Sequence, residues 1–343
     1  MWLIGLLLAI AWVPETLSGF VAPRWCVLAV AGALLVATTR IRPTTGHLLG
    51  LLFLMSATLS LLWVPDLPAA CGQLAKWVIL AWLFCAASSI EDLRPFYRGL
   101  TLGIAISGVI AVLQWYLWFN PIPQATMETG PSGLFFNKNT LAEIAVLALI
   151  GAVYSRCWLL LPFVATAAFL PGSRGALIAL VIAGFAWLLT TRWREWSVPL
   201  VILCLAPIVG HLEAQNFYSA IDRIDLWKQV LPHLTAFGAG VGQFQFIYPG
   251  ASYAHNDLLQ AVYEHGVFAL PLVLLFTTAL RGVGPERFIL IAFLVEGCFA
   301  FPLELPATAG VAAIVAGTLC GHGNYLRRAR HERRMVLSNC DLR

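Results

Sequence analysis

Long apolar stretches, separated by short polar ones, run through almost the whole chain. An α-helix needs about 17–25 mostly apolar residues to cross the hydrocarbon core of a bilayer. Stretches of roughly this length occur at 1–18, 22–38, 46–63, 70–89, 97–119, 139–155, 157–170, 173–191, 196–211, 256–281, 286–301 and 304–322. This pattern predicts an all-α, polytopic membrane protein with about 12 transmembrane helices. They are expected to form a single transmembrane domain over residues 1–322.

The composition supports the membrane prediction and excludes an ordinary soluble domain. The 343 residues are 60% hydrophobic and 11% charged, whereas soluble domains carry roughly 25% charged residues. The eight cysteines form no CxxC pair, so we expect small buried residues rather than a redox or metal site. No basic segment precedes the first apolar stretch, which predicts a retained span rather than a cleaved signal peptide. The net charge of +4 is modest, and no nucleic-acid partner is expected.

Most of the 21 lysines and arginines fall on one side of this predicted topology. Basic residues are retained on the cytoplasmic side of a membrane protein, so both termini are predicted to be cytoplasmic. The basic tail, residues 323–343, is then expected to lie near anionic lipid. On the outer side, two segments are longer than a simple turn, 120–138 and 212–255, and the second is the main outer loop.

The main outer loop contains two recognisable patterns. Residues 219–231 mix apolar and charged side chains in a way that predicts a short amphipathic helix on the membrane surface. Gly238-Ala239-Gly240-Val241-Gly242 follows. No strand precedes these glycines, so a turn is expected rather than a dinucleotide site.

The segment from Ala254 to Gly266 is unusually polar for the start of a membrane span. On a helix that advances about 100° per residue, its polar side chains Asn256, Asp257, Gln260 and Glu264 fall within one quadrant. His255 precedes this polar face. Membrane helices carry such groups when the groups face a water-filled site or pair with one another, so we expect a polar cavity here.

Basic residues on the outer side oppose the topology rule, so each needs a reason. Lys138, Arg174 and Arg223 lie there, and Lys76 lies within a span near its outer end. They either extend to lipid phosphates, pair with nearby acids, or bind an anion. Arg174 favours anion binding because it stands between Ser173 and Gly175 at a helix start, where backbone N–H groups point outwards. Several acids lie on the same side, including Glu143, Glu264, Glu296 and Glu304.

Four motifs, in order along residues 130–270, resemble those of the O-antigen ligase and O-antigen polymerase superfamily of bacterial inner membranes. They are Gly133-Leu134-Phe135-Phe136-Asn137-Lys138-Asn139-Thr140-Leu141-Ala142, Ser173-Arg174-Gly175, Arg223 with Trp227 and the following glycine turn, and His255-Asn256-Asp257-Leu258-Leu259-Gln260 through Glu264-His265-Gly266. Outside this region the chain matches only in being hydrophobic.

The resemblance implies a membrane glycosyltransferase with a GT-C-like helical fold. It would take a glycan from undecaprenyl diphosphate at the periplasmic face. The acceptor would be lipid A–core for a ligase, or a lipid-linked repeat unit for a polymerase, and the resemblance leaves the two open. The compact outer loop counts against a protein-glycosylating member with an extra C-terminal domain.

This reaction assigns roles to the polar residues. His255 is the expected base, oriented by Asp257 or Glu264. Arg174 and Arg223, assisted by Lys138, are expected to bind the diphosphate, and direct displacement would invert the anomeric centre. Asn137, Asn139, Asn256 and Lys76 are expected to support the site. No DxD motif or metal-ligand set occurs in an outer loop, so neither a metal nor another cofactor is expected.

Plainer interpretations stay open for several of these residues. His255 is alternatively a helix cap, Asn137 and Asn139 cap a helix start, Glu143 pairs with Lys138, and His265 is a packed residue away from the polar face. Two other functions also remain. One is a transporter or flippase for a lipid-linked sugar or small anion, although no internal repeat is apparent. The other is a non-catalytic assembly factor.

Overall fold

The computed structural model describes residues 1–11, 21–41, 43–119, 130–135, 137–190, 218–246 and 253–322. Within these ranges every regular element is a helix, which confirms the prediction of an all-α protein. The predicted span 196–211 and the basic tail 323–343 lie outside the described residues.

In the described part of the chain, three helical segments are long and apolar enough to cross a membrane on their own. They are α4 (Leu67–Ala87), α5 (Arg94–Tyr116) and the continuous stretch Asp257–Leu280, which contains α11 (Asp257–His265) and α12 (Leu270–Leu280). Shorter apolar helices are α2 (Ala22–Thr38), α3 (Thr45–Ser60), Trp158–Phe169 with α7 (Leu161–Phe169), α8 (Arg174–Leu189) and a last helix, Pro306–His322. The count of about 12 spans therefore stays a prediction.

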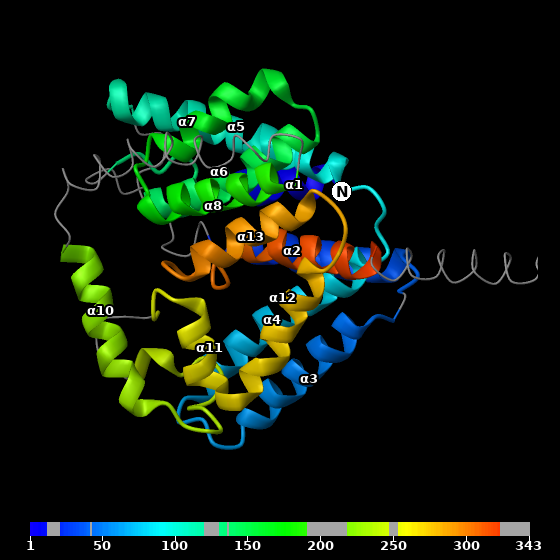
Figure 1. Cartoon of the computed structure of the whole chain (residues 1–343), viewed down its shortest axis with the longest axis vertical. Coiled ribbons are helices and arrows are strands. Elements are labelled where there is room, and N and C mark those ends of the chain that lie inside the picture. Colours follow the sequence, from blue (N-terminus) through cyan, green and yellow to red (C-terminus); the bar gives the residue numbers. More distant parts are fainter. Residues whose placement is uncertain are drawn as a thin grey trace, which may run out of the picture.

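The helices pack as two groups (Figure 1). The first group contains α5, α7, α8, α1 (Trp2–Ile10), α6 (Lys138–Tyr154) and α13 (Glu286–Gly297). The second contains α2, α3, α4 and α12, with α2 on α4 and α12 on α3. Contacts of α1 with α2 and of α12 with α13 join the groups. The amphipathic helix of the outer loop is α10 (Tyr218–Val230), which lies at the edge of the bundle in Figure 1.

Polar side chains fix where several helices begin. An oxygen side chain that accepts a hydrogen bond from a free N–H of the first turn stabilises the helix start. Thr44 caps α3, Asp66 caps α4, Asn137 caps α6 and Asn256 caps α11. Two of these caps, Asn137 and Asn256, belong to the motifs, so the motifs also define helix boundaries.

Glycines allow α1 and α5 to pack with their backbones almost in contact. A Cβ atom added at Gly99 of α5 would meet the backbone oxygen of Trp2, and one added at Gly5 of α1 would meet the backbone oxygen of Phe96. Gly103 faces Ala9 in the same interface. Small residues are the usual means by which membrane helices approach closely, so these glycines hold the N-terminal helix on the bundle.

Arg24 is a buried anchor between α1, α2 and the first motif. Its side chain is 2% exposed. The guanidinium donates hydrogen bonds to the carbonyl oxygens of Leu8 and Ala9 at the end of α1, and to that of Leu134. It also lies over the Phe135 ring, 4.3 Å from the centroid. Arg24 thus fixes the segment that leads into α6 and Lys138.

We expect Gly99→Leu to lower the free energy of unfolding by about 1–3 kcal/mol, the usual cost of overpacking, because rigid backbone stands where the side chain must go. Thermal unfolding in detergent, followed by circular dichroism, measures the change. Gly184→Ala is the matched control, since Gly184 is a helical glycine with no atom within 4 Å of an added Cβ. Equal stability of Gly99→Leu and wild type would contradict the proposed packing.

Candidate functional site

Three basic side chains from three separate segments come together near the first helix group. Lys138 is the first residue of α6, Arg174 the first residue of α8, and Arg223 belongs to α10. The charge of Arg174 acts on both Lys138 and Arg223. The three residues predicted to bind the diphosphate therefore form one cation cluster. Like charges held together in this way favour an anion between them.

Two buried glutamates accompany the cation cluster. Glu143 of α6 is 4% exposed and Glu296 of α13 is 1% exposed, and their charges act on each other. Within the described residues, both carboxyl oxygens of Glu296 and Oε2 of Glu143 have no hydrogen-bond partner. The charge of Arg223 acts on Glu143, and pairing of Glu143 with Lys138 stays the alternative that the sequence leaves open. Burial lowers the pKa of Arg223, Glu143 raises it and Arg174 lowers it.

The turn before α8 places Arg174. Gly172 has a φ of +68°, which a residue with a side chain rarely adopts, and Ser173 precedes the first helical residue. An added Cβ at Gly175 would contact the Cβ of Phe299 at 3.4 Å. The Ser-Arg-Gly motif thus makes a tight turn whose glycines let α8 begin against the segment that follows α13.

His255 lies beside the cation cluster and just before α11. Its φ of +52° is unusual for a residue with a side chain. The imidazole meets the Phe301 ring edge-on, with 5.0 Å between centroids. Burial, together with the charge of the nearby Arg223, lowers the pKa of His255 to about 4. The imidazole is therefore neutral at pH 7 and able to accept a proton. The N-cap of α11 is Asn256, so the helix-cap alternative does not describe His255.

The polar face of α11 is buried in the protein, and its carboxyl groups accept hydrogen bonds from backbone N–H groups. Asp257 Oδ2 accepts a hydrogen bond from the Leu303 N–H at 3.0 Å. Glu264 Oε2 accepts one from the Gly242 N–H at 2.9 Å. The sequence predicts that Asp257 or Glu264 orients His255. In the structure the two carboxyl groups form hydrogen bonds with these backbone N–H groups. His265 packs edge-on against Phe53 and is 2% exposed, in keeping with a packed residue.

The glycine turn of the outer loop is bound to the end of α11. Gly238, Gly240 and Gly242 have φ values of +75°, +100° and +71°. The N–H groups of Ala239 and Gly240 donate to the carbonyl oxygens of Tyr263 and Glu264, both at 2.9 Å. The segment is thus a turn, as the sequence predicts, and it forms one wall of a polar cavity.

The connection between α13 and the last helix, residues 298–304, contacts polar or aromatic side chains from several separate segments. Its contacts are Cys298 O with Asn256 Nδ2, Phe299 O with Arg223 Nη1, the Phe301 ring with His255 and Tyr253, Leu303 N with Asp257 Oδ2, and Glu304 with Lys76. Sequence analysis missed this connection, apart from noting Glu304 as an outer acid. The available signal is the pair of aromatic residues, a proline and an acid between two apolar stretches.

Lys76 belongs to a second polar cluster, away from the other predicted cations. Its ammonium lies 3.1 Å from Glu304 Oε2 and donates to Gln73 Oε1 at 2.8 Å. Glu304 Oε1 accepts from Gln73 at 2.7 Å and from Gln260 at 3.2 Å. The groups surround a cavity of about 240 Å³. Among the predicted site residues, Lys76 and Glu264 line this Lys76–Glu304 cavity, whereas Lys138, Arg174 and Arg223 form the cation cluster beside His255.

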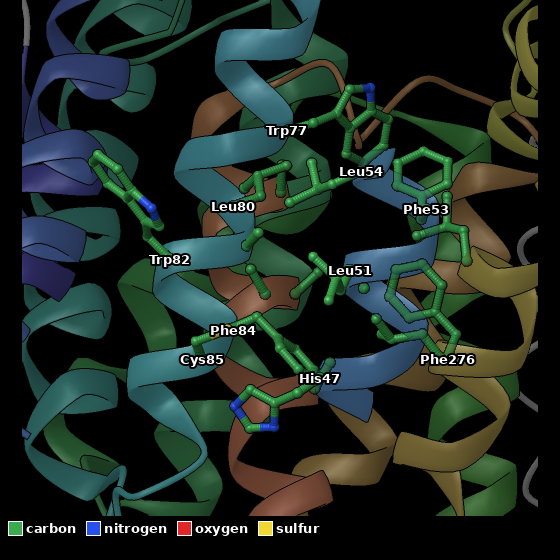
Figure 2. Close-up of a pocket in the computed structure, with 18 of the residues that line it drawn as sticks. His47, Leu51, Phe53, Leu54, Trp77, Leu80, Trp82, Phe84, Cys85 and Phe276 are labelled. Atoms are coloured by element: carbon green, nitrogen blue, oxygen red, sulfur yellow. The ribbon is translucent and has the colours of Figure 1, made fainter. Parts of the chain in front are cut away.

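An apolar cavity of about 210 Å³ lies among α3, α4, α12 and the last helix. Figure 2 shows Trp77, Phe53 and Leu54 towards one end and Phe84 with His47 towards the other. The two cavities are neighbours along the chain, since Trp77 follows Lys76 in α4 and Leu303 precedes Glu304. The apolar side chains that line this second cavity suit a hydrocarbon ligand.

Within the described part of the chain, no group of three or more His, Cys, Asp or Glu side chains is placed to hold a metal ion. Metal-independent chemistry remains a prediction from the sequence. No family model matches the chain, and no curated protein matches it either. The resemblance to the O-antigen superfamily thus rests on the four motifs alone.

Breaking the Lys76–Glu304 pair is expected to destabilise the protein. Lys76→Met leaves the Glu304 carboxylate, which is 5% exposed, without its cation. Breaking a fully buried pair costs about 3–5 kcal/mol, and because Lys76 is 28% exposed we expect a somewhat smaller loss. Adding Glu304→Gln should recover part of the loss. Chemical unfolding of the two single variants and the double variant measures the coupling, and strictly additive losses would argue against the pair.

Proposed function

We propose that the chain is an inverting membrane glycosyltransferase that moves a glycan from undecaprenyl diphosphate to an acceptor hydroxyl. The proposal includes about 12 spans, both termini in the cytoplasm of a bacterial inner membrane, and a reaction centre at the periplasmic face. The acceptor is lipid A–core or a lipid-linked repeat unit. The observation that carries the proposal is the meeting of Lys138, Arg174 and Arg223 beside His255, although the four lie in separate segments.

The chemistry follows from these groups. The acceptor oxygen attacks the anomeric carbon, the bond from that carbon to the diphosphate oxygen breaks, and the diphosphate leaves with the electron pair. The acceptor proton passes to the neutral imidazole of His255. Cations fixed beside the leaving group stabilise its growing charge without reorganising during the step. Attack from the face opposite the diphosphate inverts the anomeric configuration.

The bound diphosphate also improves the base. In the free protein the positive charge of Arg223 helps to lower the pKa of His255, after burial. An anion at Arg223 offsets that charge, so the pKa of His255 rises towards neutral pH in the complex. A base works best when its pKa lies near the working pH. Donor binding and base activation are thereby coupled.

The decisive test uses purified protein with a lipid-linked oligosaccharide donor, with and without lipid A–core. Longer glycans on the lipid carrier identify a polymerase, and a core-linked product identifies a ligase. His255→Ala, at unchanged expression and helical content, should lower transfer by about 10²–10⁴-fold. If the wild-type protein forms no product but moves the lipid across the bilayer, the transporter alternative replaces the proposal. Near-normal transfer by His255→Ala removes this residue as the base.

The pH dependence gives a separate prediction. The rate falls as the pH drops through the pKa of the base, because the protonated imidazole cannot accept a proton. For kcat/KM, which reports the free enzyme, the acid limb should lie near pH 4. For kcat, which reports the complex, it should lie at higher pH. Circular dichroism at each pH separates this effect from unfolding. Identical limbs for the two parameters would contradict the coupling.

A further inference from the structure

The Lys76–Glu304 cavity is not part of the site that we propose for the diphosphate. It lies between α4, the glycine turn, the start of α11 and the 298–304 connection. Its lining residues with polar side chains are Gln73, Lys76, Gln245, Tyr253, Gln260, Glu264 and Glu304, and Phe244 adds an aromatic ring. A cavity with a few convergent polar groups and aromatic side chains is a typical small-molecule site.

The lining offers both hydrogen-bond donors and acceptors. The Lys76 ammonium has three donors, of which two are used by Gln73 and Glu304. The Tyr253 hydroxyl and the Gln245 amide can each donate and accept. The carboxylate of Glu304 supplies acceptors. Sugar hydroxyls both donate and accept, so this mixture matches a sugar ring better than it matches a ligand with donors or acceptors alone.

The Lys76–Glu304 cavity differs from the cation cluster in its charge. Lys76 is its single cation, and it is paired with Glu304 at 3.1 Å. Glu264 adds a second carboxyl group, so the cavity has no excess of positive charge with which to hold a phosphate or a uronate. Its volume of about 240 Å³ is below the about 300–1,000 Å³ of pockets for drug-sized ligands. The cavity therefore suits one uncharged sugar ring.

One aromatic ring separates the cavity from the base. Tyr253, which lines the cavity, stacks on Phe301 with 4.5 Å between centroids and 15° between ring planes. Phe301 in turn meets His255 at 5.0 Å. We propose that the Lys76–Glu304 cavity binds a sugar of the acceptor as an uncharged pyranose, with Phe301 between that sugar and His255. This inference rests on the proposed glycosyl transfer.

Gly72 provides a way to block the cavity without removing any of its polar groups. It lies in α4 and lines the cavity, and an added Cβ meets no atom within 4 Å. Gly72→Phe therefore fills the cavity from one side, whereas Lys76→Met would also disturb folding. Gly184→Phe, in α8, is the matched control because Gly184 has the same open surroundings and does not line the cavity.

Saturation-transfer NMR on the protein in nanodiscs detects binding directly. The probes are methyl glucoside, methyl galactoside and methyl N-acetylglucosaminide, together with glucuronate and glucose 6-phosphate as charged counterparts. We expect signals from neutral glycosides in the wild type and in Gly184→Phe, and their loss in Gly72→Phe. Signals that survive in Gly72→Phe, or signals only from the anionic sugars, would overturn the assignment.

Transfer kinetics distinguish failure of this inference from failure of the proposed function. If the wild type transfers glycan, Gly72→Phe should raise the acceptor KM at least about tenfold, a loss of about 1.4 kcal/mol, with the donor KM unchanged. An unchanged acceptor KM overturns the cavity assignment and leaves the glycosyl transfer standing. If neutral glycosides bind but the wild type transfers no glycan, the proposed glycosyl transfer is overturned. The cavity then binds sugar in a protein that is not a transferase.

Discussion

A polar group buried among membrane helices must find its partner within the protein, because lipid offers none. In this chain the 298–304 connection provides partners for several of these polar groups. It accepts hydrogen bonds from Arg223 and Asn256, donates one to Asp257, and carries the acid that pairs with Lys76. The position of α10, the start of α11 and the middle of α4 all depend on this one segment. The two polar clusters are held in a fixed relation by it.

This arrangement provides two separate regions for the two requirements of the proposed transfer between lipid-linked molecules. In the proposed transfer, the leaving diphosphate needs cations, and Lys138, Arg174 and Arg223 would supply them. An incoming sugar needs mixed donors and acceptors, and the Lys76–Glu304 cavity supplies those. Phe301 lies between the Lys76–Glu304 cavity and His255, the proposed base, and its ring contacts the imidazole. The proposed function uses both regions and assigns each a different chemistry.

The sequence predicts the helical fold and the polar residues well, and their partners poorly. Periodicity places Asp257, Gln260 and Glu264 on one face of a helix, and all three are buried there. It says nothing about which backbone groups they meet, since Leu303 and Gly242 come from distant segments. The sequence pattern gives Arg24 no role, yet its three carbonyl partners make it a structural anchor. Short apolar helices likewise give no independent count of spans.

The central claim is that the outer cations form a diphosphate site. Calorimetric titration of farnesyl diphosphate into the protein in nanodiscs tests it most directly. Losing one charge-assisted contact of about 1.5–3 kcal/mol should weaken binding by roughly 10–100-fold. We predict that loss for Arg174→Gln and for Arg223→Gln, and unchanged affinity for Arg40→Gln, whose side chain is exposed elsewhere. Equal affinity in all three variants would contradict the account.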